Sequence, residues 1–62
     1  MTAFDELVDR AAAHLPDVPR LAVLDAVEAE WERLRAASEP WLAPLVLPAA
    51  VWRLRMRTDL AL

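Results

Sequence analysis

The sequence contains no glycine among its 62 residues. Glycine enters left-handed backbone conformations at little cost, so left-handed turns and helix C-caps lack their usual residue here. The same absence excludes the glycine-rich loops that bind phosphate groups. Cysteine is also absent, which excludes disulfides, thiolate metal sites and a cysteine nucleophile. The expected fold class is therefore all-α.

The chain is long enough for one small domain, 1–62, and 58% of its residues are apolar. That fraction exceeds the ~45–50% usual for globular domains, and it is not the composition of a disordered chain. With no disulfide, so short a chain has difficulty covering this much apolar surface by itself. We therefore expect an exposed apolar patch that association with a partner covers.

Apolar residues at helical spacing predict a first helix over 3–14. Thr2 and Asp5 have the positions of a capping box at its start. Pro16 interrupts the pattern, and Asp17 or Val18 is expected to cap the next helix with Pro19 in its first turn. The second helix is predicted over 19–37, and its short connection to the first suits an antiparallel helical hairpin.

The second helix carries a regular apolar seam with 3-4 spacing. We predict that the seam mediates self-association through Leu24, Val27, Trp31 and Leu34. A symmetric dimer of helical hairpins, which forms a four-helix bundle, is the simplest arrangement because one patch then covers itself. The alternative partner is a larger protein, of which this chain is an accessory subunit.

Residues 38–48 form a connector rich in proline, tryptophan and other apolar residues. Pro40, Pro44 and Pro48 recur every four residues, a spacing not expected inside one regular helix. We expect a short turn that opens at Pro40 and is capped by Ser38, then an extended segment over 45–47. The residues predicted to dock a partner protein lie in and beside this connector: Trp41, Leu42, Leu45, Leu47 and Trp52.

A short C-terminal helix is predicted over 48–58, with Pro48 at its start. Within it, residues 51–57 alternate apolar and basic side chains, which is also the pattern of a strand. A lone strand would have no partner in this chain, so a helix is preferred.

Charge is divided unevenly along the chain. The net charge is −6 over residues 1–32 and +3 over residues 33–62, which gives −3 overall. The two halves can pair within one molecule or between copies, and such complementarity favours correct register. Arg53, Arg55 and Arg57 suggest an alternative function, a small antitoxin-like or DNA-binding regulator that contacts nucleic acid.

The sequence predicts no catalytic, cofactor-binding or metal site. His14 is the single histidine, and the few hydroxyl groups provide no nucleophile with a neighbouring base. The longest uncharged stretch is too short to cross a bilayer, and the N-terminus lacks the features of an export signal. We therefore expect a cytoplasmic, non-catalytic protein–protein interaction module.

Overall fold

The structure, a computed structural model, describes the backbone of residues 2–61 and the side chains of residues 2–56. Within this range every regular element is a helix or a 3-10 turn, and there is no strand. It forms α1 (Ala3–His14), α2 (Arg20–Arg33), the 3-10 turn η1 (Pro40–Leu42) and α3 (Ala43–Ala61). The all-α prediction is confirmed, and residues 51–57 are helix, not strand.

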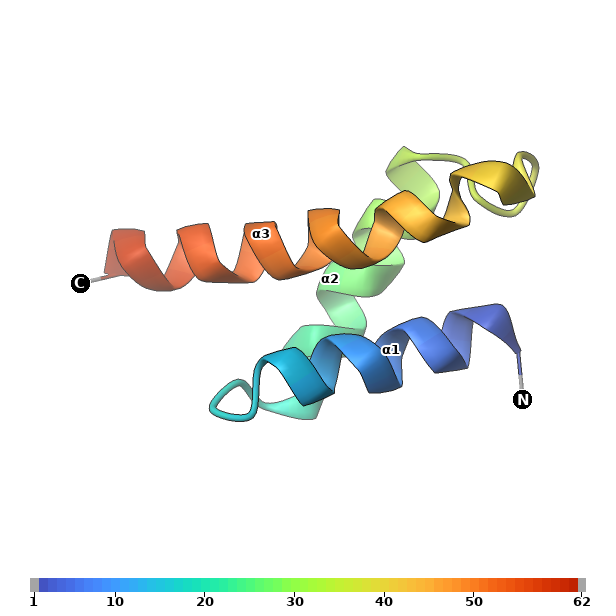
Figure 1. Cartoon of the computed structure of the whole chain (residues 1–62). Helices are drawn as coiled ribbons and strands as arrows, with labels where there is room; N and C mark the ends of the chain where they lie inside the picture. The colour runs from blue at the N-terminus through green and yellow to red at the C-terminus, as the bar shows by residue number, and fades with distance from the viewer. Residues whose placement is uncertain (1, 62) are drawn as a thin grey trace.

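The three helices pack against one another in every pairing. Figure 1 shows α1 and α3 running in the same direction, with α2 crossing behind both of them. The chain turns back after α1 as a helical hairpin requires, but α2 crosses α1 obliquely instead of lying antiparallel along it. As a result, α2 touches both other helices with one face and leaves its other face outward.

Small and branched apolar side chains fill the core between the helices. Val23, Val27 and Val46 are the largest side chains that are completely buried. The other buried apolar residues are Leu7, Val8, Ala11, Leu15, Ala26, Ala36, Ala50 and Leu54. Phe4 and Trp31 pack against this core and meet edge-to-face, with ring centroids 5.4 Å apart. Such a contact adds to the stability gained from burying the two rings.

The predicted bounds of the first helix are confirmed by α1. Its capping box is formed as expected, because the Asp5 N–H donates to the Thr2 hydroxyl oxygen at 3.2 Å. The Thr2 N–H in turn donates to the Asp5 carboxylate at 3.4 Å. These bonds satisfy amide groups that a helix start leaves without partners.

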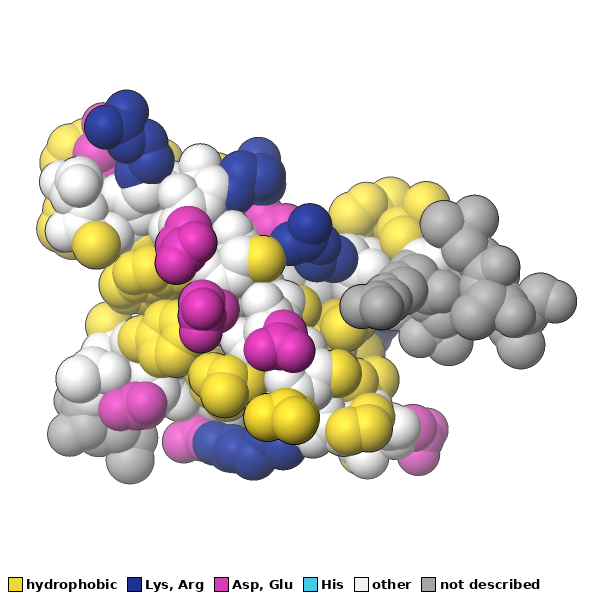
Figure 2. Space-filling view, turned by 180° about the vertical axis from the view of Figure 1, so that it is seen from behind, with side chains coloured by type: hydrophobic (Ala, Val, Ile, Leu, Met, Phe, Trp, Pro, Cys, Tyr) yellow, Lys and Arg dark blue, Asp and Glu magenta, His cyan; other side chains and the backbone are white. Residues whose placement is uncertain are grey.

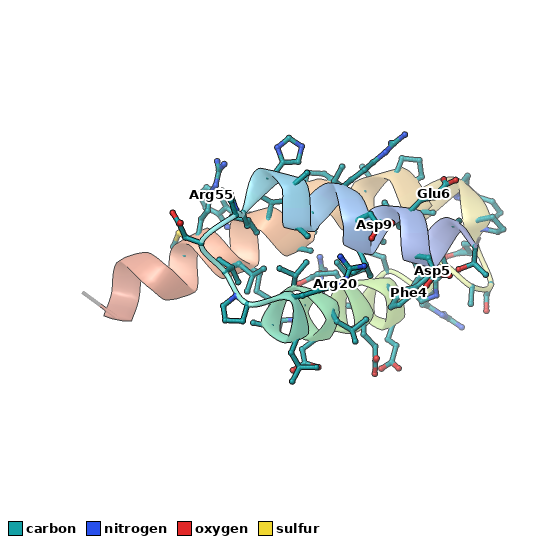
Figure 3. All side chains as sticks on the ribbon, turned by 90° about the horizontal axis from the view of Figure 1, so that it is seen from below. Phe4, Asp5, Glu6, Asp9, Arg20 and Arg55 are labelled. Carbon is teal, nitrogen blue, oxygen red and sulfur yellow. The ribbon has the colours of Figure 1, made fainter. Side chains whose placement is uncertain are left out.

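The predicted start of the second helix is wrong by one residue. Arg20 begins α2, and Pro19 is its N-cap, without a side-chain hydrogen bond. The Pro19 carbonyl accepts hydrogen bonds from the Ala22 and Val23 N–H groups. Neither Asp17 nor Val18 therefore serves as the cap. A salt bridge between Arg20 and Asp9 joins the start of α2 to α1, and Figure 3 shows the two side chains facing one another.

The predicted end of the second helix, at residue 37, is also wrong. The helix ends at Arg33, and Arg35 adopts a left-handed conformation with φ of 57°. The Ala36 N–H donates to the Trp31 carbonyl and the Arg35 N–H to the Glu32 carbonyl, which together form a Schellman motif. This motif reverses the chain and buries Ala36 in the core. An arginine thus occupies the position that glycine usually takes.

The prolines do not break the C-terminal segment as predicted. The turn at Pro40 is confirmed as η1, but its N-cap is Glu39, which makes no side-chain cap bond, so Ser38 is not the cap. Helix α3 begins at Ala43, so the predicted extended segment over 45–47 and the helix start at Pro48 are wrong. Pro44 lies in the first turn, where no N–H is required, and only Pro48 removes an internal hydrogen bond.

Candidate interaction surface

Large apolar side chains are exposed along η1 and α3. Trp41 is 70% exposed and Trp52 is 67% exposed, and Leu45 and Met56 are also exposed. We call these four residues the outer stripe. Tryptophan side chains left in water are unusual, and they are enriched among the residues that dominate protein interfaces.

Helix α3 has apolar side chains on two separate faces. At 100° per residue, Leu45, Trp52 and Met56 lie within about 40° of one another around the helix axis. The buried residues Val46, Ala50 and Leu54 centre about 140° away from them. The core therefore uses one face of α3, and the α3 members of the outer stripe, Leu45, Trp52 and Met56, lie on the far side of the helix.

Arginines flank the outer stripe on both sides, about 80° from its centre around the helix. Arg53 lies 3.4 Å from the carboxylate of Glu30, which is only 6% exposed and is also paired with Arg33. Arg55 projects on the opposite side of α3 and has no ion pair with another described side chain. Arg57 lies outside the described side chains. Of the three arginines predicted to contact nucleic acid, Arg53 is thus already paired within the molecule.

The residues predicted to dock a partner divide into two groups. Trp41, Leu45 and Trp52 lie on the outer stripe, whereas Leu42 and Leu47 are half-buried. Leu47 packs against the core. Sequence analysis missed Met56, although its spacing of four residues from Trp52 was visible as part of one helical face.

The residues predicted to mediate self-association lie mostly toward the core. Val27 is completely buried within the single chain. Leu24, Trp31 and Leu34 are half-buried and pack against the core cluster. The seam therefore packs α2 against the core of its own chain. Its partly exposed members, Leu24, Trp31 and Leu34, are the ones that a partner can still contact.

Acidic side chains gather on the outward face of α2. This face carries three acidic residues at helical spacing, Asp25, Glu28 and Glu32, and the apolar Leu21 lies one turn before them. All four side chains are exposed. Figure 2 shows acidic groups on this face with apolar side chains directly beside them. The acidic surface and the arginine-flanked stripe are therefore on different helices of the same small molecule.

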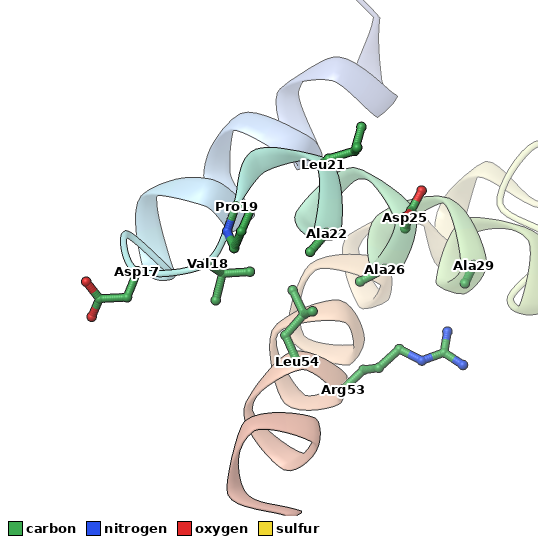
Figure 4. A pocket seen from close by; sticks show the side chains of 10 residues that line it. All are labelled: Asp17, Val18, Pro19, Leu21, Ala22, Asp25, Ala26, Ala29, Arg53 and Leu54. Atoms are coloured by element: carbon green, nitrogen blue, oxygen red, sulfur yellow. The ribbon is translucent and has the colours of Figure 1, made fainter. Parts of the chain in front are cut away.

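A groove of about 890 Å³ lies between α2 and α3. Its apolar lining includes the small residues Ala22, Ala26 and Ala29 from α2, together with Val18 and Leu54. Figure 4 shows Asp17 at one end of this groove and Arg53 at the other, while Leu21 and Asp25 project outward from α2. The groove is open and mostly apolar, with charged groups only around its edge.

The described residues contain no group of three potential metal-ligating side chains. His14 lies in the last turn of α1. The helices in the described part of the chain include none that is long and apolar enough to cross a membrane. Comparison of the chain with protein-family models, with curated proteins and with solved structures gives no match.

Proposed function

We propose that this protein is a non-catalytic interaction module that docks a protein partner on the outer stripe of α3. The observation that carries the proposal is the second apolar face of α3, which the chain's own core does not use. Covering exposed apolar surface is worth about 25 cal/mol per Å², so a partner that covers two tryptophans gains substantially.

The size of the exposed surface supports the same proposal. The accessible surface of the chain is 4503 Å². A folded monomer of 7.0 kDa is expected to expose about 4,000 Å². The excess fits the elongated shape, 36 × 21 × 14 Å, and the projection of α3 beyond the other helices. A partner seated along α3 would restore the usual ratio of surface to mass.

The alternative function, a regulator that contacts nucleic acid, has less support. Arg53 is paired with Glu30, and acidic residues cover much of α1 and α2. A small number of free cations gives weak binding to phosphates, and that binding weakens further with salt. The arrangement of charges thus favours a protein partner.

Photo-cross-linking through photo-methionine at Met56, in cells that produce the chain, tests the proposed function, because the sequence has no lysine or cysteine for amine- or thiol-reactive reagents. We expect the wild-type chain to appear in cross-linked species heavier than the monomer. The double variant Leu45→Ser/Trp52→Ser should lose these species, because both substitutions remove apolar area from the outer stripe. The matched control, Glu28→Ser/Glu32→Ser on the exposed face of α2, should retain them.

Two outcomes would contradict the proposal. One is a wild-type chain that is recovered only as a monomer. The other is a double variant that retains every cross-linked species of the wild type. Circular dichroism of the purified double variant is the folding control. We expect its helical signal to match that of the wild type, because both substituted side chains lie outside the core.

A further inference from the structure

We infer that the outer stripe docks an amphipathic helix with acidic edges, and that this helix belongs to a different protein. The inference rests on the proposed function and adds the chemistry of the partner. It depends on the spacing of the apolar side chains on α3, on the arginines beside them, and on the helices that this chain itself could offer.

The exposed side of α3 has the spacing of a coiled-coil seam. Four apolar residues are separated by four, three and four positions, as a and d residues are in a heptad: Leu45, Ala49, Trp52 and Met56. At 100° per residue they lie within about 60° of one another around the helix axis. A helix packed on a globular core typically has an apolar face at least about 100° wide, whereas a narrower seam is typical of pairing with one other helix. The spacing therefore favours a helix as the occupant.

Arginines occupy both edges of this seam. In the same heptad register Arg53 takes an e position and Arg55 a g position, where the side chains of paired helices form ion pairs. Arg55 is exposed and has no ion pair with another described side chain (Figure 3). Arg53 lies 3.4 Å from Glu30, but its side chain is 50% exposed and a guanidinium group has five N–H donors. Both arginines can therefore bind carboxylates on the edges of a partner helix.

The described helices of this chain do not match the seam. The described side chains of α3 include no acid, so a second copy of α3 would bring no carboxylate to either arginine. The outward face of α2 has three acids where a seam needs apolar residues, Asp25, Glu28 and Glu32. Pairing that face with α3 would bury carboxylates against Trp52, which is costly. Helix α1 exposes no large apolar side chain. We therefore place the matching helix on a different protein.

An anionic membrane is the other surface that attracts both tryptophan and arginine. The narrow seam is less suited to a membrane surface, because a helix that lies in the interface buries a broad apolar face. In addition, residues 1–32 have a net charge of −6, so anionic lipids would repel the body of the molecule. The observations favour a protein helix.

Fluorescence anisotropy with two labelled model peptides tests the inference. Both are helical peptides about three heptads long with leucine at a and d, and they differ only in having glutamate or lysine at e and g. Like charges at these positions keep each peptide from pairing with itself. We expect the full 62-residue chain to bind the glutamate peptide with a dissociation constant at least about tenfold below that of the lysine peptide. Equal binding of the two peptides, or no binding of the glutamate peptide at about 1 mM, would overturn the inference.

A substitution in the seam tests where the peptide binds. Trp52→Ala should raise the dissociation constant of the glutamate peptide at least about tenfold, the effect of losing an interface anchor. Leu21→Ala is the matched control, because it removes an exposed apolar side chain from α2. It should change the constant less than about threefold. Equal effects of the two variants would exclude the outer stripe as the docking site.

A charge reversal tests the acidic edges of the partner. Arg55→Glu should weaken binding of the glutamate peptide and strengthen binding of the lysine peptide, so the preference between them is lost or reversed. Arg10→Glu is the matched control, because it makes the same change of charge at an exposed position on α1. It should leave the preference in place. An Arg55→Glu variant with the wild-type preference, or a control that loses it equally, overturns the role of the arginine.

Vesicles of phosphatidylglycerol and phosphatidylcholine separate a lipid surface from a protein helix. We expect the wild-type chain to stay in solution when the vesicles are sedimented. Vesicle binding that Trp52→Ala abolishes would overturn the protein helix as the occupant of the outer stripe.

Failure of this inference can be told apart from failure of the proposed function. If the peptides bind equally but cross-linked species in cells still depend on Leu45 and Trp52, the interaction role stands with a partner of different chemistry. If the cross-linked species do not depend on these residues either, both proposals fall.

Discussion

Arg35 shows how the chain replaces a missing residue type. Its left-handed backbone lets the Schellman motif close after α2, and the motif in turn delivers Ala36 to the core. A side chain with a Cβ atom is disfavoured in this conformation by roughly 1–2 kcal/mol. The fold therefore accepts local strain at one position to turn the chain without glycine.

Replacing Arg35 with glycine should stabilise the protein. We expect Arg35→Gly to raise the free energy of unfolding by about 0.5–1 kcal/mol, because relief of the left-handed strain exceeds the entropy that glycine adds to the unfolded chain. Urea denaturation followed by circular dichroism measures the difference. Ala37→Gly is the control: this nearby residue does not have positive φ, so the change should destabilise. Equal effects of the two variants would disprove the argument from strain.

At the scale of elements, α1 could be predicted from the sequence because its local signals agree with one another. Its cap, its apolar spacing and the proline after it all indicate one helix over 3–14. The end of α2 could not be predicted, because Leu34 and Trp41 continue the apolar seam beyond Arg33, with only the small polar Ser38 between them. Only the packing of Ala36 and the left-handed Arg35 show where the helix stops.

The start of α3 was mispredicted because three prolines spaced four residues apart were not expected to lie in and before one regular helix. Pro40 and Pro44 both lie where a helical start has no N–H to pair, so neither costs a hydrogen bond. A residue with an N–H group at position 48 would donate it to the Pro44 carbonyl. Proline has no N–H, so Pro48 removes a single hydrogen bond close to the helix start. Val46 and Ala50, which are completely buried, hold this turn against the core.

Pro48→Ala should therefore stabilise the protein by about 1–2 kcal/mol. The change restores one backbone hydrogen bond and removes the clash with the preceding turn, although it also frees the unfolded chain. Pro44→Ala is the matched control, because its position in the first turn needs no donor, and it should change stability little. Thermal unfolding of both variants measures the difference. A Pro48→Ala variant that is no more stable than Pro44→Ala would show that the missing bond has no net cost.

At the scale of the whole molecule, the sequence predicted that large apolar side chains would remain exposed, but it located only some of them. Trp41, Leu45 and Trp52 were predicted at a docking surface and are exposed on one stripe. Val27 was predicted at an interface but lies in the core, because periodicity cannot separate a face turned to the chain's own core from one turned to a partner. The groove depends on how α2 crosses α3, so no sequence pattern indicated it.

Thermal stability should not depend on protein concentration if a different protein covers the outer stripe. In a dimer of identical chains, each tenfold increase in concentration would add about 0.7 kcal/mol per chain, since a dimer gains about 1.4 kcal/mol. For a domain of this size, the unfolding midpoint would then rise by about 3–5 °C per tenfold increase. Scanning calorimetry measures the shift. We expect the wild-type midpoint to stay constant, and a midpoint that rises in this way would show that two copies combine.

The exposure of two tryptophans on the outer stripe has a consequence for how such a protein is produced. A subunit that binds a different protein keeps exposed apolar surface whenever the two chains are synthesised in unequal amounts. Chaperones or proteases then act on the unbound excess. A chain whose partner is a second copy of itself would instead always meet its complement in equal number. Its expression level can then vary widely without leaving orphan molecules behind.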